Sequence, residues 1–283
     1  MGKLSKKIGL IGCGNMGEAF LAAIIKSGIS SSSKISVCDI RKERLDIFNQ
    51  LYGVSTTKDN FKLFSESDVV ILAVKPQQMD QVLADIAKRK DFKITKRKLI
   101  ISIAAGISIK NLENSLYSNL DESSMSKFPI IRVMPNTPAL VLSGMSGMSA
   151  NRYSTADDIK ISKDLLQATG KVIQFKEKDL DAVTALSGSG PAYVFFFIES
   201  MIEAGISLDL NPEDAAVLTL TTLKGALKLI EELNESPKSL RNKVTSPGGT
   251  TEAAIDVLDN KNVRQNIIDA VVAAYRRSKE LGL

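Results

Sequence analysis

The sequence lacks histidine and tryptophan altogether, and it has only two cysteines among 283 residues. The absence of histidine excludes a Ser-His-Asp triad, a histidine general base and a histidine-ligated zinc ion. Cys13 and Cys38 each follow or end a predicted strand, and two such thiols do not make a disulfide scaffold. We therefore expect a protein of a reducing compartment, with no metal site and with both cysteines acting as small packing residues.

Long apolar segments are also missing. The first apolar run is too short for a signal peptide, and the longest candidate, Ala192 to Ile198, is too short to cross a membrane. The net charge of +5 lies in short clusters without interleaved aromatic residues, a pattern that argues against nucleic-acid binding. It fits a solvated face that attracts anionic substrates. We expect a soluble, cytoplasmic protein with neither a membrane nor a nucleic-acid partner.

The N-terminal stretch carries the pattern Gly12-x-Gly14-x-x-Gly17 between an apolar strand, Ile8–Ile11, and a helix that runs to Lys26. This context indicates a dinucleotide site. Gly12 allows the tight turn, Gly14 lets the backbone approach a pyrophosphate, and Gly17 lets the helix lie close to the strand. The free N–H groups at the helix start favour phosphate.

Apolar strands alternate with helices through the first part of the chain, which predicts an α/β fold with a doubly wound parallel sheet of the Rossmann type. Ligands bind beyond the carboxyl ends of strands in such sheets, so the segments that follow the strands are the candidates for a site. From about Lys178 only helical patterns occur. The sequence thus predicts a dinucleotide-binding domain over residues 1–177 and an all-helical domain over residues 178–283.

One helix of the second domain is apolar on all sides at Val194–Ile198. Such a segment must be buried on more than one side. Two interpretations stand: the helices hide it within a core of their own, or they form a homodimer interface. The wide apolar faces favour the dimer.

Two breaks interrupt the helices. Glycines and a proline at residues 184–193 force a kink or a break. The stretch Val244–Glu252 reads as a tight turn that opens a helix, with Thr250 or Thr251 able to cap it. Free N–H groups at that helix start would suit a carboxylate. The alternative is an ordinary corner between helices with Ser/Thr caps, and the local pattern does not separate the two.

A whole series of motifs carries a resemblance to a known family. Gly12–Gly17, Ala73–Pro76, Ser102–Gly106, Arg132–Pro138, Ala185–Tyr193 and Val244–Thr251 together resemble the motifs of pyrroline-5-carboxylate reductases, in the same order along nearly the whole chain. The resemblance implies reduction of the C=N bond of 1-pyrroline-5-carboxylate to L-proline by hydride transfer from NAD(P)H, the last step of proline biosynthesis. It also implies that the helical domain is a dimerisation domain, and that the homodimers can assemble further into pentamers of dimers.

The resemblance also implies site residues. The cofactor pyrophosphate would lie on Ile11, Gly12, Cys13, Gly14, Asn15 and Met16. The nucleotide and nicotinamide would be lined by Asn60, Ala73, Val74, Lys75, Pro76, Ala105 and Asn136. The substrate carboxylate would bind at Ser246, Gly248, Gly249, Thr250 and Thr251, with the Thr251 hydroxyl as the catalytic group beside the ring nitrogen. Lys243 departs from the pattern, because the animal enzymes have an asparagine there.

The choice between cofactors rests on the end of the second strand. Asp39 would bond a ribose hydroxyl and repel a 2′-phosphate, which favours NAD(H). Arg41 and Lys42 follow directly and could bind that phosphate. The family mostly uses NADPH, so NADP(H) is favoured and NAD(H) stays possible.

Two alternatives remain, one of them another Rossmann enzyme and the other a protein of a different class. A β-hydroxyacid dehydrogenase would have a similar layout and use a lysine acid from its second domain. Lys224 and Lys228 could stand there, although no matching motif surrounds them. A protein that binds NADP without turnover is the other alternative, and the intact Ser246–Thr251 turn argues against it.

Overall fold

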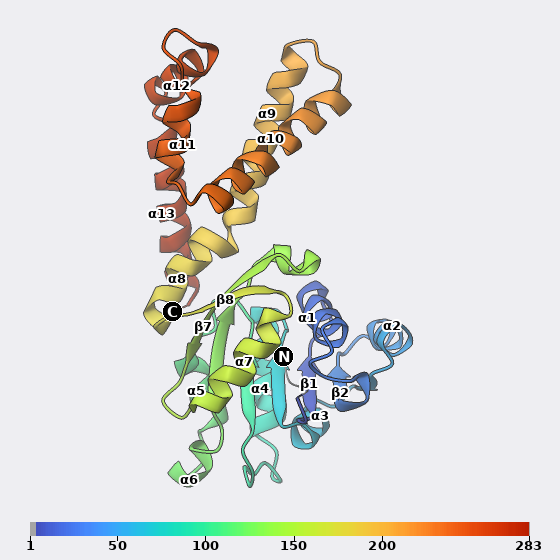
Figure 1. Ribbon diagram of the computed structural model, residues 1–283. Helices are drawn as coiled ribbons and strands as arrows, with labels where there is room; N and C mark the ends of the chain where they lie inside the picture. The colour runs from blue at the N-terminus through green and yellow to red at the C-terminus, as the bar shows by residue number, and fades with distance from the viewer. Residues whose placement is uncertain (1–3, 283) are drawn as a thin grey trace. The chain divides into compact units, whose positions relative to one another are not determined.

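The computed structural model describes residues 4–282 and contains one eight-stranded sheet, in the order β3-β2-β1-β4-β5-β6-β7-β8 (Figure 1). The strands are β1 (Ile8–Ile11), β2 (Ile35–Cys38), β3 (Ser55–Thr57), β4 (Val69–Leu72), β5 (Leu99–Ser102), β6 (Ile130–Met134), β7 (Gly144–Ala150) and β8 (Gly170–Gln174). The central strands β1, β4 and β5 are buried along their whole length. Their continuous apolar runs form strands because both faces of the sheet are covered.

Helices cover the two faces of the sheet. They are α1 (Asn15–Lys26), α2 (Lys42–Tyr52), α3 (Asn60–Glu66), α4 (Pro76–Ala87), α5 (Ile109–Leu116), α6 (Glu122–Met125), α7 (Ala156–Gln167) and the short α8 (Leu180–Val183). One core joins the sheet to α1, α2 and α7 through side chains such as Phe20, Phe48 and Leu165. The other core joins it to α3, α4 and α5 through side chains such as Phe64 and Met79. The predicted doubly wound fold is therefore confirmed.

Two strands of the sheet were not predicted from the sequence. β7 pairs antiparallel with β6, so the sheet departs at this place from the all-parallel pattern expected of it. Its sequence, Gly-Met-Ser-Gly-Met-Ser-Ala, has no β-branched residue, and the strand forms because its neighbours on both sides complete its hydrogen bonds. β3 is only three residues long and lies at the sheet edge.

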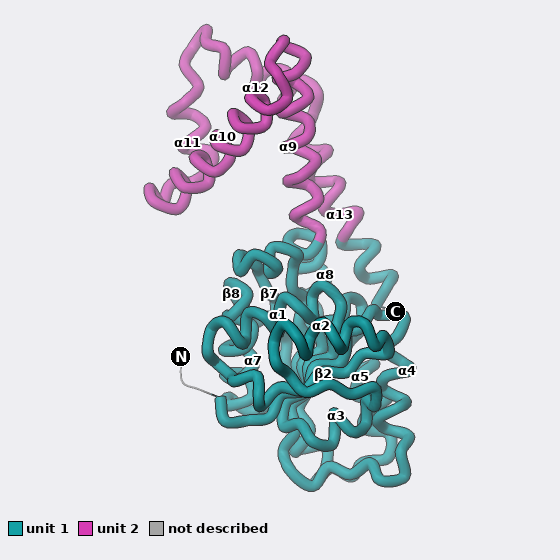
Figure 2. Tube along the Cα trace, turned by 90° about the vertical axis from the view of Figure 1, so that its right-hand side faces the viewer, with its two compact units in different colours: residues 1–188, 275–283 teal, residues 189–274 magenta. Residues whose placement is uncertain are grey.

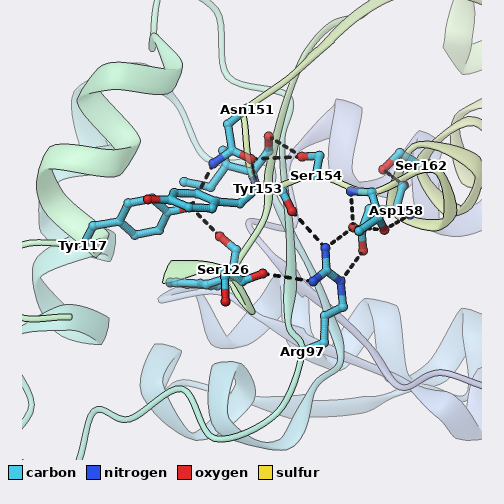
Figure 3. A network of polar contacts seen from close by, with 11 residues as sticks. Arg97, Tyr117, Ser126, Asn151, Tyr153, Ser154, Asp158 and Ser162 are labelled. Carbon is cyan, nitrogen blue, oxygen red and sulfur yellow. Dashed lines mark hydrogen bonds and ion pairs between the residues drawn. The ribbon is translucent and has the colours of Figure 1, made fainter. Parts of the chain in front are cut away.

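A polar network ties the amino-terminal edge of the sheet together (Figure 3). Arg97, just before β5, forms an ion pair with Asp158 of α7 and donates 3.0 Å hydrogen bonds to the carbonyls of Ser126 and Tyr153. Asp158 also completes the capping box that starts α7 at Thr155. These contacts connect the segment before β5 to the loops that contain Ser126 and Tyr153 and to the start of α7. They lie at the edge of the sheet opposite to the carboxyl ends of the strands, where the candidate site lies.

The chain divides into two compact units (Figure 2). One consists of the residues up to Gly188 together with those from Tyr275 on, and the other is Ser189–Ala274. The second unit holds α9 (Gly190–Ser207), α10 (Pro212–Leu233), α11 (Pro237–Val244), α12 (Thr250–Asn260) and most of α13 (Val263–Leu281). Between Thr184 and Gly188 a π-helical turn precedes α9, which confirms the predicted break.

The second unit has almost no core of its own. Of residues 189–274, all of which are described, Ala215 and Thr219 alone are buried. Large apolar side chains are exposed instead, among them Phe195, Phe196 and Phe197 at 59%, 73% and 50%. Of the helices that the structure describes, none is long and apolar enough to span a bilayer.

Candidate functional site

The glycine loop after β1 is shaped by contact with the loop after β4. Gly12 has φ +104°, and a Cβ there would lie 2.7 Å from the carbonyl carbon and oxygen of Ala73. A Cβ on Gly17 would lie 2.2 Å from the carbonyl oxygen of Gly12. Both positions therefore need glycine for packing alone. Gly14 is different, because no heavy atom beyond its own residue and its two chain neighbours lies within 4 Å of the place its Cβ would take.

The space beside Gly14 lies at the start of α1. Gly14 is the N-cap and has no side-chain cap, and the N–H groups of Asn15, Met16 and Gly17 find no acceptor among residues 4–282. Here the helix after β1 packs on one face of the sheet and the helix after β4 on the other. This strand pair is the topological switch point at which such sheets bind ligands. An open cradle with three free donors fits a pyrophosphate.

The backbone of Cys13 is held on both sides by Asp39, which follows β2, and Arg44 of α2. Its N–H donates to Asp39 at 2.8 Å, and its carbonyl accepts from the Arg44 Nε at 2.8 Å. Arg44 also pairs with Glu18 of α1. Sequence reasoning did not select Arg44, since nothing in its local pattern shows that the side chain returns to the glycine loop.

Both cysteines are buried thiols. Burial, followed by the charge of Asp39, raises the pKa of Cys13 to about 12, and the same two causes raise the pKa of Cys38 to about 12. Thiols with such pKa values stay protonated at neutral pH and are poor nucleophiles. Their expected role as packing residues agrees with this burial.

Asp39 is fully occupied by hydrogen-bond donors. One carboxylate oxygen accepts from the N–H of Arg41 at 2.9 Å and from its Nε at 3.0 Å. The other accepts from the N–H of Cys13 at 2.8 Å and from the Arg41 Nη2 at 3.0 Å. Burial would raise the pKa of Asp39, but these bonds outweigh it and keep the pKa below its ordinary value. A carboxylate has about four lone-pair sites, so Asp39 has none left for a ribose hydroxyl.

The other cofactor candidates lie at the same carboxyl edge, in the segments that follow β3, β4, β5 and β6. They are Asn60, Ala73, Val74, Lys75, Pro76, Ala105 and Asn136. Asn60 is fixed by bonds with the Cys38 thiol (3.1 Å) and with Asp85 (3.0 Å). Pro76 is the first residue of α4, as the sequence predicts, and Lys75 is its N-cap.

Asn136 links the strand ends to the π-helical turn. Its side-chain oxygen accepts from the N–H of Met145 at 2.8 Å, and its Nδ2 donates to the Ser187 hydroxyl at 3.3 Å. Ser187 was not assigned a role from the sequence, although it lies within one of the motifs that carried the resemblance. The structure brings it into this group because the π-helical turn changes the direction of its side chain relative to an α-helix.

In the second unit, Ser246–Gly249 form a type II turn. The Gly249 N–H donates to the Ser246 carbonyl at 3.0 Å, and Gly248 has φ +72°, as the third residue of this turn requires. Gly249 is the N-cap of α12 and has no side-chain cap. The prediction that Thr250 or Thr251 caps the helix is therefore wrong, because the turn places the helix start one residue earlier.

Three backbone N–H donors remain free at this turn. The N–H groups of Thr250, Thr251 and Glu252 have no acceptor in the described part of the chain, and the Thr251 hydroxyl has no partner there either. The N–H groups of Gly248 and Gly249 are engaged, by Glu252 and Ser246 respectively. Free donors at the start of an eleven-residue helix suit a carboxylate.

Two lysines that were singled out from the sequence form ion pairs: Lys228, a candidate acid of the dehydrogenase alternative, and Lys243, the departure from the family pattern. Lys228 pairs with Glu232 at 3.5 Å on the helix surface, where both side chains are exposed. Lys243 pairs with Glu235 at 2.6 Å. Among the described residues no cluster of three or more Asp, Glu or Cys side chains could hold a metal ion.

Family models match both parts of the chain. A model described as "Pyrroline-5-carboxylate reductase dimerisation" matches residues 177–281, and one described as "NADP oxidoreductase coenzyme F420-dependent" matches residues 7–106. The dimerisation model covers the helical region, which points to a homo-oligomer.

Curated sequences and solved structures match along the whole length. A pyrroline-5-carboxylate reductase of Synechocystis is 40% identical over 279 residues, which is 99% of each chain. The structure of such a reductase from Coxiella burnetii has a TM-score of 0.87 at 37% identity and covers 99% of this chain and 100% of its own. A Plasmodium falciparum pyrroline carboxylate reductase, solved with NADP bound, has a TM-score of 0.86 at 31% identity and covers 100% of both chains.

Proposed function

Because this chain belongs to the pyrroline-5-carboxylate reductase family, we propose that it reduces the C=N bond of 1-pyrroline-5-carboxylate to L-proline with a hydride from NADPH. The observation that carries the proposal is the presence in one chain of two anion sites built from free backbone N–H groups. One is the cradle beside Gly14, and the other is the turn before α12. The first suits a dinucleotide and the second a small carboxylate.

The residues at the carboxyl edge of the sheet fit a dinucleotide. Residues Ile11 to Met16 would hold the pyrophosphate, with the space at Gly14 and the free donors of α1. Asn60, Ala73, Val74, Lys75, Pro76, Ala105 and Asn136 would line the nucleoside and the nicotinamide. When bound, the cofactor supplies the hydride, so the protein needs no redox-active side chain of its own.

Arg41 would select NADP(H) over NAD(H). Asp39 has no free lone pair for a ribose hydroxyl, and its negative charge is paired with Arg41. The Arg41 side chain is 53% exposed and keeps further N–H donors for a 2′-phosphate. NAD(H) lacks that phosphate and would lose only this contact with Arg41, so we expect it to serve as a cofactor that binds more weakly.

The turn at Ser246–Thr251 would hold the substrate. The free N–H groups of Thr250 and Thr251 would bind its carboxylate, with Ser246, Gly248 and Gly249 shaping the turn. The Thr251 hydroxyl would lie beside the ring nitrogen. The hydride adds to the C=N carbon, and the nitrogen keeps or receives one proton. A protonated imine is already electrophilic, which is why no histidine is needed.

The helical region would form a homodimer. The supporting observations are the match to a dimerisation model and the exposed apolar side chains Phe195, Phe196 and Phe197. Pentamers of dimers are the further assembly that we propose. We keep residues 1–177 as the dinucleotide-binding domain and residues 178–283 as the substrate-binding and dimerisation domain. The two buried, unbridged cysteines suit a reducing compartment, and we place the protein in the cytoplasm.

The test is oxidation of NADPH and of NADH by the purified protein, with and without 1-pyrroline-5-carboxylate. We expect oxidation that depends on the imine and is faster at low concentrations of NADPH than of NADH. Product analysis should identify L-proline. Binding of NADPH without imine reduction would contradict the proposal and would favour a nucleotide-sensing protein.

A further inference from the structure

The carboxylate of Glu252 closes back onto the turn that precedes its own helix. Its Oε2 accepts a hydrogen bond from the Gly248 N–H at 2.7 Å. Glu252 is the third residue of α12, a position at which an acidic side chain also interacts favourably with the helix dipole. Nothing in the proposed function assigns a task to this residue.

The bonded N–H belongs to the one peptide group that distinguishes type II from type I turns. That group joins Pro247 to Gly248, and in a type II turn it is flipped relative to type I. Glycine tolerates both conformations, so Gly248 itself does not hold the flip. The hydrogen bond from Gly248 to Glu252 does hold it, because the flipped peptide directs its N–H toward the carboxylate.

This peptide lies directly before Gly249, so its N–H group is close to the free N–H groups at the start of α12. Gly249 is the N-cap of that helix, and a Cβ there would lie 2.6 Å from the Ser246 hydroxyl, so the turn is tightly closed. If the Pro247–Gly248 peptide turned over, its carbonyl oxygen would take the place of the Gly248 N–H, while the residues on either side of the turn would stay nearly in place. The freed Gly248 N–H would also become a competing donor for any carboxylate bound at this turn.

We propose that Glu252 is a positioning residue for the substrate carboxylate, an inference that rests on the proposed function. By engaging the Gly248 N–H, it holds the turn in the conformation in which the N–H groups of Thr250 and Thr251 are free to bind the carboxylate. It does not touch the reacting atoms. Its effect is on substrate binding and not on the cofactor.

Three variants test this role. Glu252→Ala removes the acceptor, and Glu252→Gln keeps an acceptor oxygen in the same place but removes the charge. Asp256→Ala is the matched control, because Asp256 lies one turn later on α12, is exposed, and has no hydrogen-bond or ion-pair partner among residues 4–282. The measurements are KM for 1-pyrroline-5-carboxylate, KM for NADPH, kcat, and the inhibition constant of L-proline. Circular dichroism verifies that each variant is folded.

We expect Glu252→Ala to raise KM for the imine and the inhibition constant of L-proline about tenfold, as the loss of one positioning hydrogen bond predicts. KM for NADPH should not change. Glu252→Gln should restore KM to within about threefold of the wild-type value, and Asp256→Ala should match the wild type.

Several results would overturn the role of Glu252 and leave the proposed function standing. Provided that the wild-type protein is active, one such result is a KM for the imine that is unchanged or lowered in Glu252→Ala. Others are a parallel rise in KM for NADPH in that variant, or a rise in KM for the imine that is equally large in Glu252→Gln. An equal defect in Asp256→Ala would do the same. A wild-type protein that does not reduce the imine would contradict the proposed function and this inference together.

Discussion

Arg41 binds both carboxylate oxygens of Asp39, through its Nε and its Nη2, each at 3.0 Å. An acidic residue at this position normally binds the ribose hydroxyls of NAD. Here the carboxylate of Asp39 instead holds the guanidinium group of Arg41 in place. This pairing also explains why the cofactor choice could not be decided from residue types. Both residues are present in the sequence, and only the structure shows that they pair, with the Arg41 side chain 53% exposed and the Asp39 side chain 7% exposed.

The first prediction concerns this pair. Arg41→Met should raise KM for NADPH roughly 10- to 100-fold, because a charge-assisted contact with the 2′-phosphate is lost. KM for NADH should stay the same or fall, since the lone pairs of Asp39 become free. Steady-state kinetics with both cofactors measure this. Arg89→Met is the control, because Arg89 also pairs with an aspartate two residues away but lies after α4. Equal changes for NADPH and NADH would contradict the assignment.

The second prediction separates two glycines of one motif. Gly14→Ala should leave the thermal midpoint nearly unchanged and weaken NADPH binding at least tenfold, because the added methyl group enters an empty cradle. Gly17→Ala should instead destabilise the fold by about 1–3 kcal/mol, since its Cβ would meet the backbone of Gly12. Thermal unfolding and NADPH titration distinguish them. A Gly14→Ala variant that binds NADPH normally would exclude the cradle as the pyrophosphate site.

The third prediction concerns the Thr251 hydroxyl, which has no partner among the described residues. Thr251→Ala should lower kcat about 100-fold, as expected for loss of a group that handles a proton in the transition state. Thr251→Ser should retain most of the activity, and NADPH binding should be unaffected in both. Thr222→Ala, at an exposed position of α10, is the control. If Thr251→Ala weakened cofactor binding while kcat stayed normal, the role of Thr251 would be wrong.

The fourth prediction uses a buried lysine. Lys98 is 4% exposed, and its ammonium group donates to the carbonyls of Phe64 and Ser67 at the end of α3. Burial, and then the charge of Lys96, lowers the pKa of Lys98 from 10.5 to about 8. Between these two values the unfolded chain binds more protons than the folded one, so the stability contributed by this group rises with pH.

The variant Lys98→Met isolates this effect. From below pH 8 to above pH 10, the free energy of unfolding of the wild type should rise relative to the variant, by an amount on the order of 3 kcal/mol. Urea unfolding across this range measures it. Lys110→Met, at an exposed lysine of α5, should show a constant difference from the wild type. A constant difference for Lys98→Met as well would show that its pKa is not lowered.

The fifth prediction tests the assembly. Phe196→Glu places a charge on a side chain that is 73% exposed within one chain, and it should convert the dimer to monomers. Val141→Glu, at a position 72% exposed in the first unit, should remain dimeric. Light scattering after size-exclusion chromatography gives the mass of each. A dimeric Phe196→Glu protein would place the interface elsewhere.

The strands that could be predicted are those whose own residues favour a strand, and the strand β7, which could not be predicted, depends on its contacts with neighbouring strands. β1 and β4 were predicted because their apolar runs and flanking residues are local signals. β7 was not, since Gly144–Ala150 becomes a strand through its neighbours and not through its own residues.

The site divides in the same way. The glycine loop was recognisable from its spacing, and the structure gives Gly12 a positive φ and packs Gly17 closely against the carbonyl oxygen of Gly12. The bonds of Arg44 to Cys13 and of Asn136 to Ser187 join residues far apart in sequence, and no local pattern encodes them. The start of α12 was misplaced by one residue because a turn hydrogen bond, and not a hydroxyl, determines its N-cap.

The last turns of α13 belong to the same compact unit as the glycine loop. Ser278 donates to Asp181 at 2.8 Å, and a Cβ on Gly106 would lie 3.4 Å from the Leu281 carbonyl oxygen. The first unit is thus interrupted in sequence by the whole of Ser189–Ala274. During synthesis on the ribosome, the nucleotide-binding unit cannot complete its packing until the intervening helices have emerged. The order in which the chain is made therefore delays completion of the first unit until after the second has been translated.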